Sequence, residues 1–99
     1  MASTSGTINT NAQGSTAVTL AITTETLITL DVFNATGTHD NSKMTLEFSP
    51  DNGDNWLQGD QFTNGTGSIS FHRATTKVRA YVHTAEGSTA TSNVFITAV

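Results

Sequence analysis

A strict alternation of apolar and polar residues constrains this chain most, because a period of two places every second side chain on one face of an extended strand. The alternation recurs in six segments of the 99-residue chain. Their apolar positions are Val18, Leu20 and Ile22, then Ile28, Leu30 and Val32, then Met44, Leu46 and Phe48, then Ile69 and Phe71, then Val78, Ala80 and Val82, and finally Val94, Ile96 and Ala98. Residues 7–10 and 56–58 are candidates for two shorter strands. No segment keeps the helical period of about 3.6 residues long enough to indicate a helix, so the sequence predicts an all-β fold.

Turn-forming residues separate these segments, because Asn, Asp, Gly and Ser are concentrated between them. Strands at intervals of about 8–12 residues with such turns are typical of antiparallel sandwiches and barrels. We therefore predict one antiparallel β-sandwich domain of about seven or eight strands over residues 15–99, preceded by a flexible, polar N-terminal arm over residues 1–14. The predicted core consists of Val18, Leu20, Ile22, Ile28, Leu30, Val32, Leu46, Phe48, Ile69, Phe71, Val78, Val82, Val94 and Ile96.

The composition excludes several classes of function. Eight acidic residues outnumber four basic ones, and the net charge of −4 makes nucleic acid and anionic membranes poor partners. The chain has no cysteine, so it forms neither disulfides nor thiolate metal sites. The longest mostly apolar run, 27–33, is far shorter than the ~20 residues that span a membrane. The first residues lack the pattern of a secretory signal, so we expect synthesis in the cytoplasm without cleavage.

The strongest local motif is Ser49-Pro50-Asp51-Asn52-Gly53-Asp54-Asn55-Trp56. In such a segment the Asp51 carboxylate can accept hydrogen bonds from turn amides, and Gly53 can adopt a positive φ. The large ring of Trp56 can then fold back over the turn. We therefore predict a structural hairpin held by Ser49, Asp51, Gly53 and Trp56.

This motif resembles the Asp-box of sialidases and other propellers, which implies a structural role for it rather than a catalytic one. Two other interpretations of the segment stay open. Asp51, Asp54 and Asp60 are candidate ligands of a calcium loop, although no ordered series of oxygen ligands with a closing Glu follows them. Alternatively, Trp56 is a candidate platform on which a sugar stacks.

The residue pattern predicts no enzymatic activity and no bound metal or cofactor. No Gly-x-Ser-x-Gly segment frames a nucleophile, and no glycine-rich phosphate loop is present. The three histidines, His39, His72 and His83, lack a spacing that would bring three or four zinc ligands together. We interpret them as surface histidines.

One set of polar-phase residues is a candidate interface. Arg79 and Tyr81 alternate with the apolar residues of segment 77–83, Glu47 does so in 44–48, and Phe95 does so in the last segment. If these segments are neighbours in one sheet, the four side chains share one outer face with Thr45. Aromatic residues and arginine are enriched at the centres of protein interfaces. The alternative is an ordinary half-exposed sheet face with a cross-strand Arg79–Glu47 pair.

Segments 44–56 and 77–87 look like the third and sixth strands of fibronectin type III and other immunoglobulin-like domains. The first ends in an Asp-Gly-rich hairpin with a tryptophan, and the second joins a Val-Arg-Ala strand to a glycine turn. The resemblance covers about a third of the chain and implies an immunoglobulin-like sandwich. The sequence departs from that family at two positions. Ala74 stands near the expected tyrosine, and Phe33 and aliphatic residues replace the tryptophan of the second strand.

The layout also resembles small structural proteins of tailed bacteriophages, such as capsid decoration proteins and tail-associated sandwiches. The shared features are a cysteine-free chain rich in Thr, Ser, Gly and Asn, a Ser-Pro-Asp-Asn-Gly hairpin, and a final apolar strand. This resemblance implies a virion protein that binds a major capsid or tail protein, or copies of itself, and stabilises the particle. Alternatively, the protein is a carbohydrate-binding or adhesion module that binds a glycan.

Overall fold

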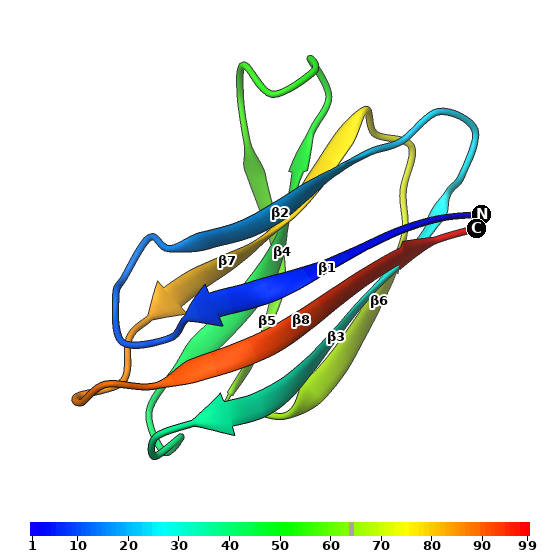
Figure 1. Ribbon diagram of the computed structural model, residues 1–99. Helices are drawn as coiled ribbons and strands as arrows, with labels where there is room; N and C mark the ends of the chain where they lie inside the picture. The colour runs from blue at the N-terminus through cyan, green and yellow to red at the C-terminus, as the bar shows by residue number, and fades with distance from the viewer. Residues whose placement is uncertain (64) are drawn as a thin grey trace.

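The computed structural model describes residues 1–63 and 65–99, and it consists of two four-stranded antiparallel sheets packed face to face (Figure 1). Sheet I has the strand order β1-β8-β3-β6, and sheet II has the order β2-β7-β4-β5. The strands are β1 (Ala2–Asn9), β2 (Thr16–Ala21), β3 (Leu27–Thr36), β4 (Lys43–Ser49), β5 (Leu57–Thr63), β6 (Gly67–His72), β7 (Lys77–Thr84) and β8 (Thr91–Ala98). The predicted all-β antiparallel sandwich is therefore confirmed. In the described ranges no helix has the length and apolar character needed to cross a membrane.

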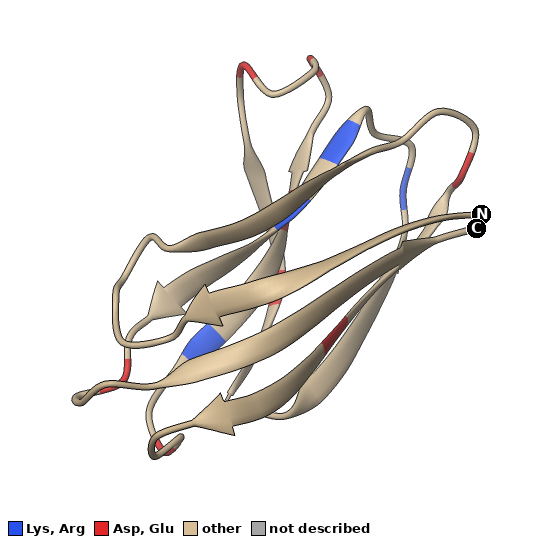
Figure 2. Cartoon of the chain, viewed as in Figure 1, with Lys and Arg blue, Asp and Glu red and all other residues tan. Residues whose placement is uncertain are grey.

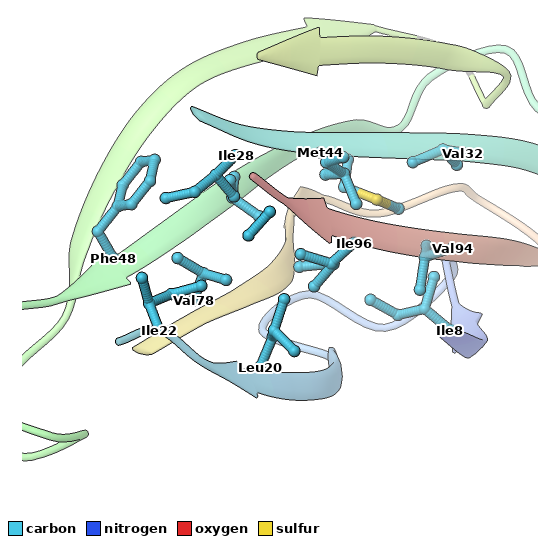
Figure 3. Packing of buried hydrophobic residues seen from close by; sticks show 14 of the residues in the cluster. Ile8, Leu20, Ile22, Ile28, Val32, Met44, Phe48, Val78, Val94 and Ile96 are labelled. Carbon is cyan, nitrogen blue, oxygen red and sulfur yellow. The ribbon is translucent and has the colours of Figure 1, made fainter. Parts of the chain in front are cut away.

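The core lies between the two sheets, where apolar side chains from both meet (Figure 3). Eleven of the fourteen predicted core residues are buried, and Val18, Ile69 and Phe71 are half-buried. These three lie on β2 and β6, which are edge strands and have a neighbour on one side only. Five apolar residues outside the predicted core are also buried, namely Ile8, Met44, Ala80, Ala90 and Ala98. Met44, Ala80 and Ala98 occupy apolar positions of the alternating segments.

The N-terminal segment differs from the expected flexible arm. Residues 2–9 form β1, which pairs antiparallel with β8 over its whole length, from Ala2↔Ala98 to Asn9↔Thr91. Ile8 is 1 % exposed and belongs to the core. The segment lacks the apolar alternation of the other strands because its remaining inward positions are Ala2, Thr4 and Gly6. Because threonine and serine occupy alternate positions, apolar alternation did not reveal this regular strand.

The sheet order also differs from that of immunoglobulin domains. In those domains the last two strands lie side by side in one sheet. Here β7 belongs to sheet II, whereas β8 crosses to sheet I and lies between β1 and β3. The chain changes sheets at every connection except β4–β5, so β1 and β2 at its start also lie in different sheets (Figure 1). This arrangement decides which outer face each exposed side chain of β8 occupies.

Candidate functional site

The hairpin between β4 and β5 projects beyond the two sheets (Figure 1) and is held by local hydrogen bonds. The buried Ser49 hydroxyl donates to Asp51 Oδ1 at 2.9 Å and accepts from the Gly53 amide at 2.7 Å. The Asn55 amide donates to the same carboxylate oxygen of Asp51 at 2.8 Å. Gly53 has a φ of +100°, a value that favours glycine. Hydrogen bonds from the Asn55 side chain and amide hold the pKa of Asp51 below its usual value.

Trp56 packs on the outer face of sheet II rather than in the core. The guanidinium of Arg79 lies over its ring, 4.0 Å from the ring centroid, and the ring is half-buried. A cation stacked on a tryptophan ring is attracted to it electrostatically, in addition to the free energy gained by burying apolar surface. One face of the ring is therefore occupied by Arg79, and that face is not open for a sugar to stack on.

Replacing Trp56 by alanine is expected to lower the free energy of unfolding by about 1–3 kcal/mol, less than for a core aromatic, because the ring is only half-buried. Urea unfolding followed by circular dichroism measures this loss without relying on the fluorescence of the single tryptophan. Leu57→Ala is the control, because Leu57 is the next residue and is 50 % exposed. Equal losses for both variants would contradict the packing of Arg79 on the ring.

Three of the four predicted interface residues, Glu47, Arg79 and Tyr81, lie on the outer face of sheet II, where Arg79 contacts Trp56. Cross-strand register places Glu47 opposite Arg79 and Thr45 opposite Tyr81 on the outer face of sheet II. Arg79 Nε donates to Glu47 Oε1 at 2.8 Å, and Glu47 is 5 % exposed. The fully buried Thr45 hydroxyl lies 3.0 Å from the carbonyl oxygens of Gly59 and Asp60, at a bulge of β5. Glu47, Arg79 and Thr45 thus each make a polar contact within the chain.

The fourth predicted residue, Phe95, lies on the opposite side of the molecule because β8 belongs to sheet I. There it packs against Phe33 of β3, with ring centroids 5.8 Å apart and ring planes at 82°. Edge-to-face packing of this kind is a favourable aromatic geometry. The two rings remain 44 % and 53 % exposed. Sequence reasoning missed Phe33, although its position on the polar phase after Val32 was the available signal.

The aromatic face, defined as the outer face of sheet I around Phe33 and Phe95, is otherwise made mainly of small polar residues, with Leu27 and His72 at one end. Its exposed or half-exposed positions on the four strands include Ser3, Ser5, Thr7, Thr29, Asp31, Ser68, Ser70, Asn93 and Thr97. All four basic residues lie elsewhere, namely Lys43 on β4, Lys77 and Arg79 on β7, and Arg73 after β6 (Figure 2). Asp31 is the single charged residue on the four strands of sheet I in the described ranges. The aromatic face is thus nearly uncharged.

Glu86 joins the loops at one end of the sandwich, a role that no sequence motif indicated. Its carboxylate is 5 % exposed and accepts the amides of Asp40, Asn41 and Ser42, the shortest at 2.6 Å from Ser42. Its own amide donates to the Thr10 carbonyl at 2.8 Å. Burial raises the pKa of Glu86, but the three amide hydrogen bonds outweigh that effect and hold the pKa below its usual value.

The described residues contain no group of three or more His, Asp or Glu side chains arranged to hold a metal ion. No cavity or cleft is found in the same ranges. Two candidate surfaces therefore remain. One is the β4–β5 hairpin together with Trp56, Arg79 and Glu47, and the other is the aromatic face.

Comparisons with known proteins identify the fold but no family. No family model matches the chain, and no curated protein matches it. Among solved structures, the chain is similar to YomS, an SPBc2 prophage-derived protein, with a TM-score of 0.56 and 10 % sequence identity. The similarity covers 98 % of this chain and 96 % of YomS. The chain therefore has the same overall fold as that protein.

Proposed function

We propose that this protein is a virion structural protein, a capsid decoration or tail-associated subunit that stabilises a particle by binding a major capsid or tail protein. Two observations support this proposal. The fold is similar over nearly the whole chain to that of a prophage-derived protein. The composition and the Ser-Pro-Asp-Asn-Gly hairpin resemble those of small phage structural proteins.

The aromatic face is the surface by which we propose that it docks, and the exposed Phe33–Phe95 pair is the observation that carries this assignment. Two phenylalanines that each leave about half of their surface in water gain free energy when a partner covers them. The surrounding serines and threonines are short polar groups of the kind found at an interface rim. This face fits a partner surface that has an apolar pocket for the two rings. Because the face is nearly uncharged, the partner surface needs no complementary charge.

The double variant Phe33→Ser with Phe95→Ser tests this docking surface. Both side chains are exposed, so the variant is expected to fold, and its incorporation into particles is expected to fall at least tenfold, because interface aromatics carry much of the binding energy. The measurement is quantitative mass spectrometry of purified particles whose own copy of the gene has been replaced by the variant. Circular dichroism and thermal melting establish that the variant is folded.

Leu57→Ser is the matched control, because Leu57 is 50 % exposed but lies on β5 of the other sheet. It is expected to be incorporated like the wild type. Incorporation of the double variant at wild-type stoichiometry would show that the aromatic face is not the docking surface. Absence of the unmodified protein from every particle would rule out the virion function itself.

A further inference from the structure

The outer edge of β1 carries backbone hydrogen-bonding groups that no other strand pairs in the described part of the chain. The Thr10 amide donates to the Ala90 carbonyl, and Thr10 continues the register in which Ile8 lies opposite Ser92. In an antiparallel ladder, residues that bond to the neighbour alternate with residues that face away from it. The even-numbered residues of β1 therefore bond to β8. The odd-numbered residues, Ser3, Ser5, Thr7 and Asn9, direct their N–H and C=O groups away from the sheet.

No strand is hydrogen-bonded along this edge in residues 1–63 and 65–99, although β2 lies close to β1. The four odd-numbered residues are exposed. Val18 of β2 lies against the inward face of Gly6, where an added Cβ would come within 3.1 Å of Val18 Cγ1. This contact places β2 across the sandwich from β1 rather than along its open edge.

The edge also lacks the features by which proteins prevent edge-to-edge pairing, which are charges, prolines, bulges and short length. β1 is eight residues long, Ala-Ser-Thr-Ser-Gly-Thr-Ile-Asn, and its register with β8 is unbroken. The edges of sheet II are irregular, because the pairing of β2 shifts between Thr16 and Thr19 and β5 carries a bulge beside Asp60. Edge strand β6 is shorter, with six residues.

We propose that β1 pairs antiparallel with β1 of a second copy of this chain, which joins two copies of sheet I into one continuous eight-stranded sheet. A two-fold axis at Gly6 places Ser5 of one copy opposite Thr7 of the other and Ser3 opposite Asn9. Each of these pairs then exchanges both N–H···O=C bonds, because the odd-numbered residues face the open edge in both copies. No charged side chain of β1 opposes its counterpart across this contact. This inference does not depend on docking to a particle.

Charge substitution at the open edge tests the proposal. Ser5→Lys with Thr7→Lys places lysines directly opposite each other across the two-fold axis, while both side chains stay exposed in the single chain. Analytical ultracentrifugation of the wild type is expected to show a concentration-dependent dimer of twice the 10.4 kDa chain mass. The dissociation constant of the dilysine variant is expected to rise at least tenfold. Mixing it with Ser5→Glu, Thr7→Glu chains is expected to restore a mixed dimer.

The matched control is Ser68→Lys with Ser70→Lys on β6, the other edge of the same sheet. Each pair of substitutions removes one cross-strand hydroxyl hydrogen bond, Thr7 to Asn93 or Ser70 to Thr29, so their effects on the single chain are comparable. The control is expected to dimerise like the wild type. Loss of the dimer in the control but not in the β1 variant would overturn the proposal.

Hydrogen exchange measured by NMR provides a readout for each residue. Raising the protein concentration is expected to slow exchange of the amides of Ser3, Ser5, Thr7 and Asn9, while the even-numbered amides of β1 are protected at every concentration. A dimer that leaves these four amides fast-exchanging would assign self-association to another surface, such as the aromatic face. A chain that stays monomeric up to about 1 mM, where weak complexes form, would exclude the pairing altogether.

Discussion

Replacing Glu86 by alanine is expected to lower the free energy of unfolding by about 3–4 kcal/mol, because it removes a buried carboxylate that accepts three consecutive amides. Each hydrogen bond to a charged group contributes about 1.5–3 kcal/mol, and the contributions of one shared carboxylate are not additive. The substitution also leaves the Ser42 amide, part of a buried residue, without its acceptor. Urea unfolding followed by Trp56 fluorescence measures the loss.

Glu25→Ala is the matched control for this variant. The Glu25 carboxylate likewise accepts the amides of Thr23 and Thr24, but these hydrogen bonds lie on an exposed turn. Water can replace that carboxylate, so a much smaller decrease is expected. A decrease as large as that of Glu86→Ala would show that burial does not strengthen the Glu86 contacts.

The same carboxylate predicts a dependence of stability on pH. The pKa of Glu86 is lower in the folded chain than its ordinary value of 4.5, so the folded state binds a proton less readily than the unfolded state. Its contribution to stability is therefore fully present above about pH 4.5 and is lost as the pH falls through the folded pKa. The difference in unfolding free energy between wild type and Glu86→Gln is expected to shrink as the pH is lowered below this value. A difference that is constant from pH 7 to about pH 3 would contradict the assignment.

Replacing Gly37 by alanine is expected to lower the free energy of unfolding by about 3–4 kcal/mol, because the backbone conformation and the available space both exclude a side chain. Gly37 has a φ of +80°, in the left-handed region. A Cβ at this position would lie 2.2 Å from the Thr89 carbonyl oxygen and 2.8 Å from the Ala90 Cα. These are backbone atoms, so the β3–β4 and β7–β8 loops would have to move apart. Chemical denaturation of the purified variant measures the effect.

Gly87→Ala is the control for Gly37→Ala, because it lies in the same β7–β8 loop and a Cβ there would meet no atom within 4 Å. This variant is expected to be as stable as the wild type. The two substitutions add the same methyl group to loops at the same end of the sandwich. Similar losses for both would show that close approach at Gly37 is not what limits this position.

Local sequence patterns were sufficient for most of the strands, the core and the hairpin. The alternation through Ile28, Leu30 and Val32 identified a buried face, because a strand in a sandwich directs every second side chain into the core, whichever strands lie beside it. The residues that hold the β4–β5 hairpin lie between Ser49 and Asn55, so their hydrogen bonds form within a few residues and depend little on the rest of the chain. Such contacts can therefore be predicted from the local sequence.

The tertiary structure alone decided how the strands are shared between the two sheets. Alternation shows which face of a strand is buried, but it does not show which strand lies beside it. The placement of β8 between β1 and β3 therefore could not be derived from the sequence. Because of this placement, Phe95 lies far from Arg79 and packs against Phe33. Only the end of β1, within residues 7–10, was expected as a strand, because hydrogen bonds to β8 rather than an apolar pattern hold the serines and threonines of β1 in the sheet. Glu86 could not be found for the same reason, since its carboxylate accepts amides more than 40 residues away in the sequence, and only the folded chain brings those groups together.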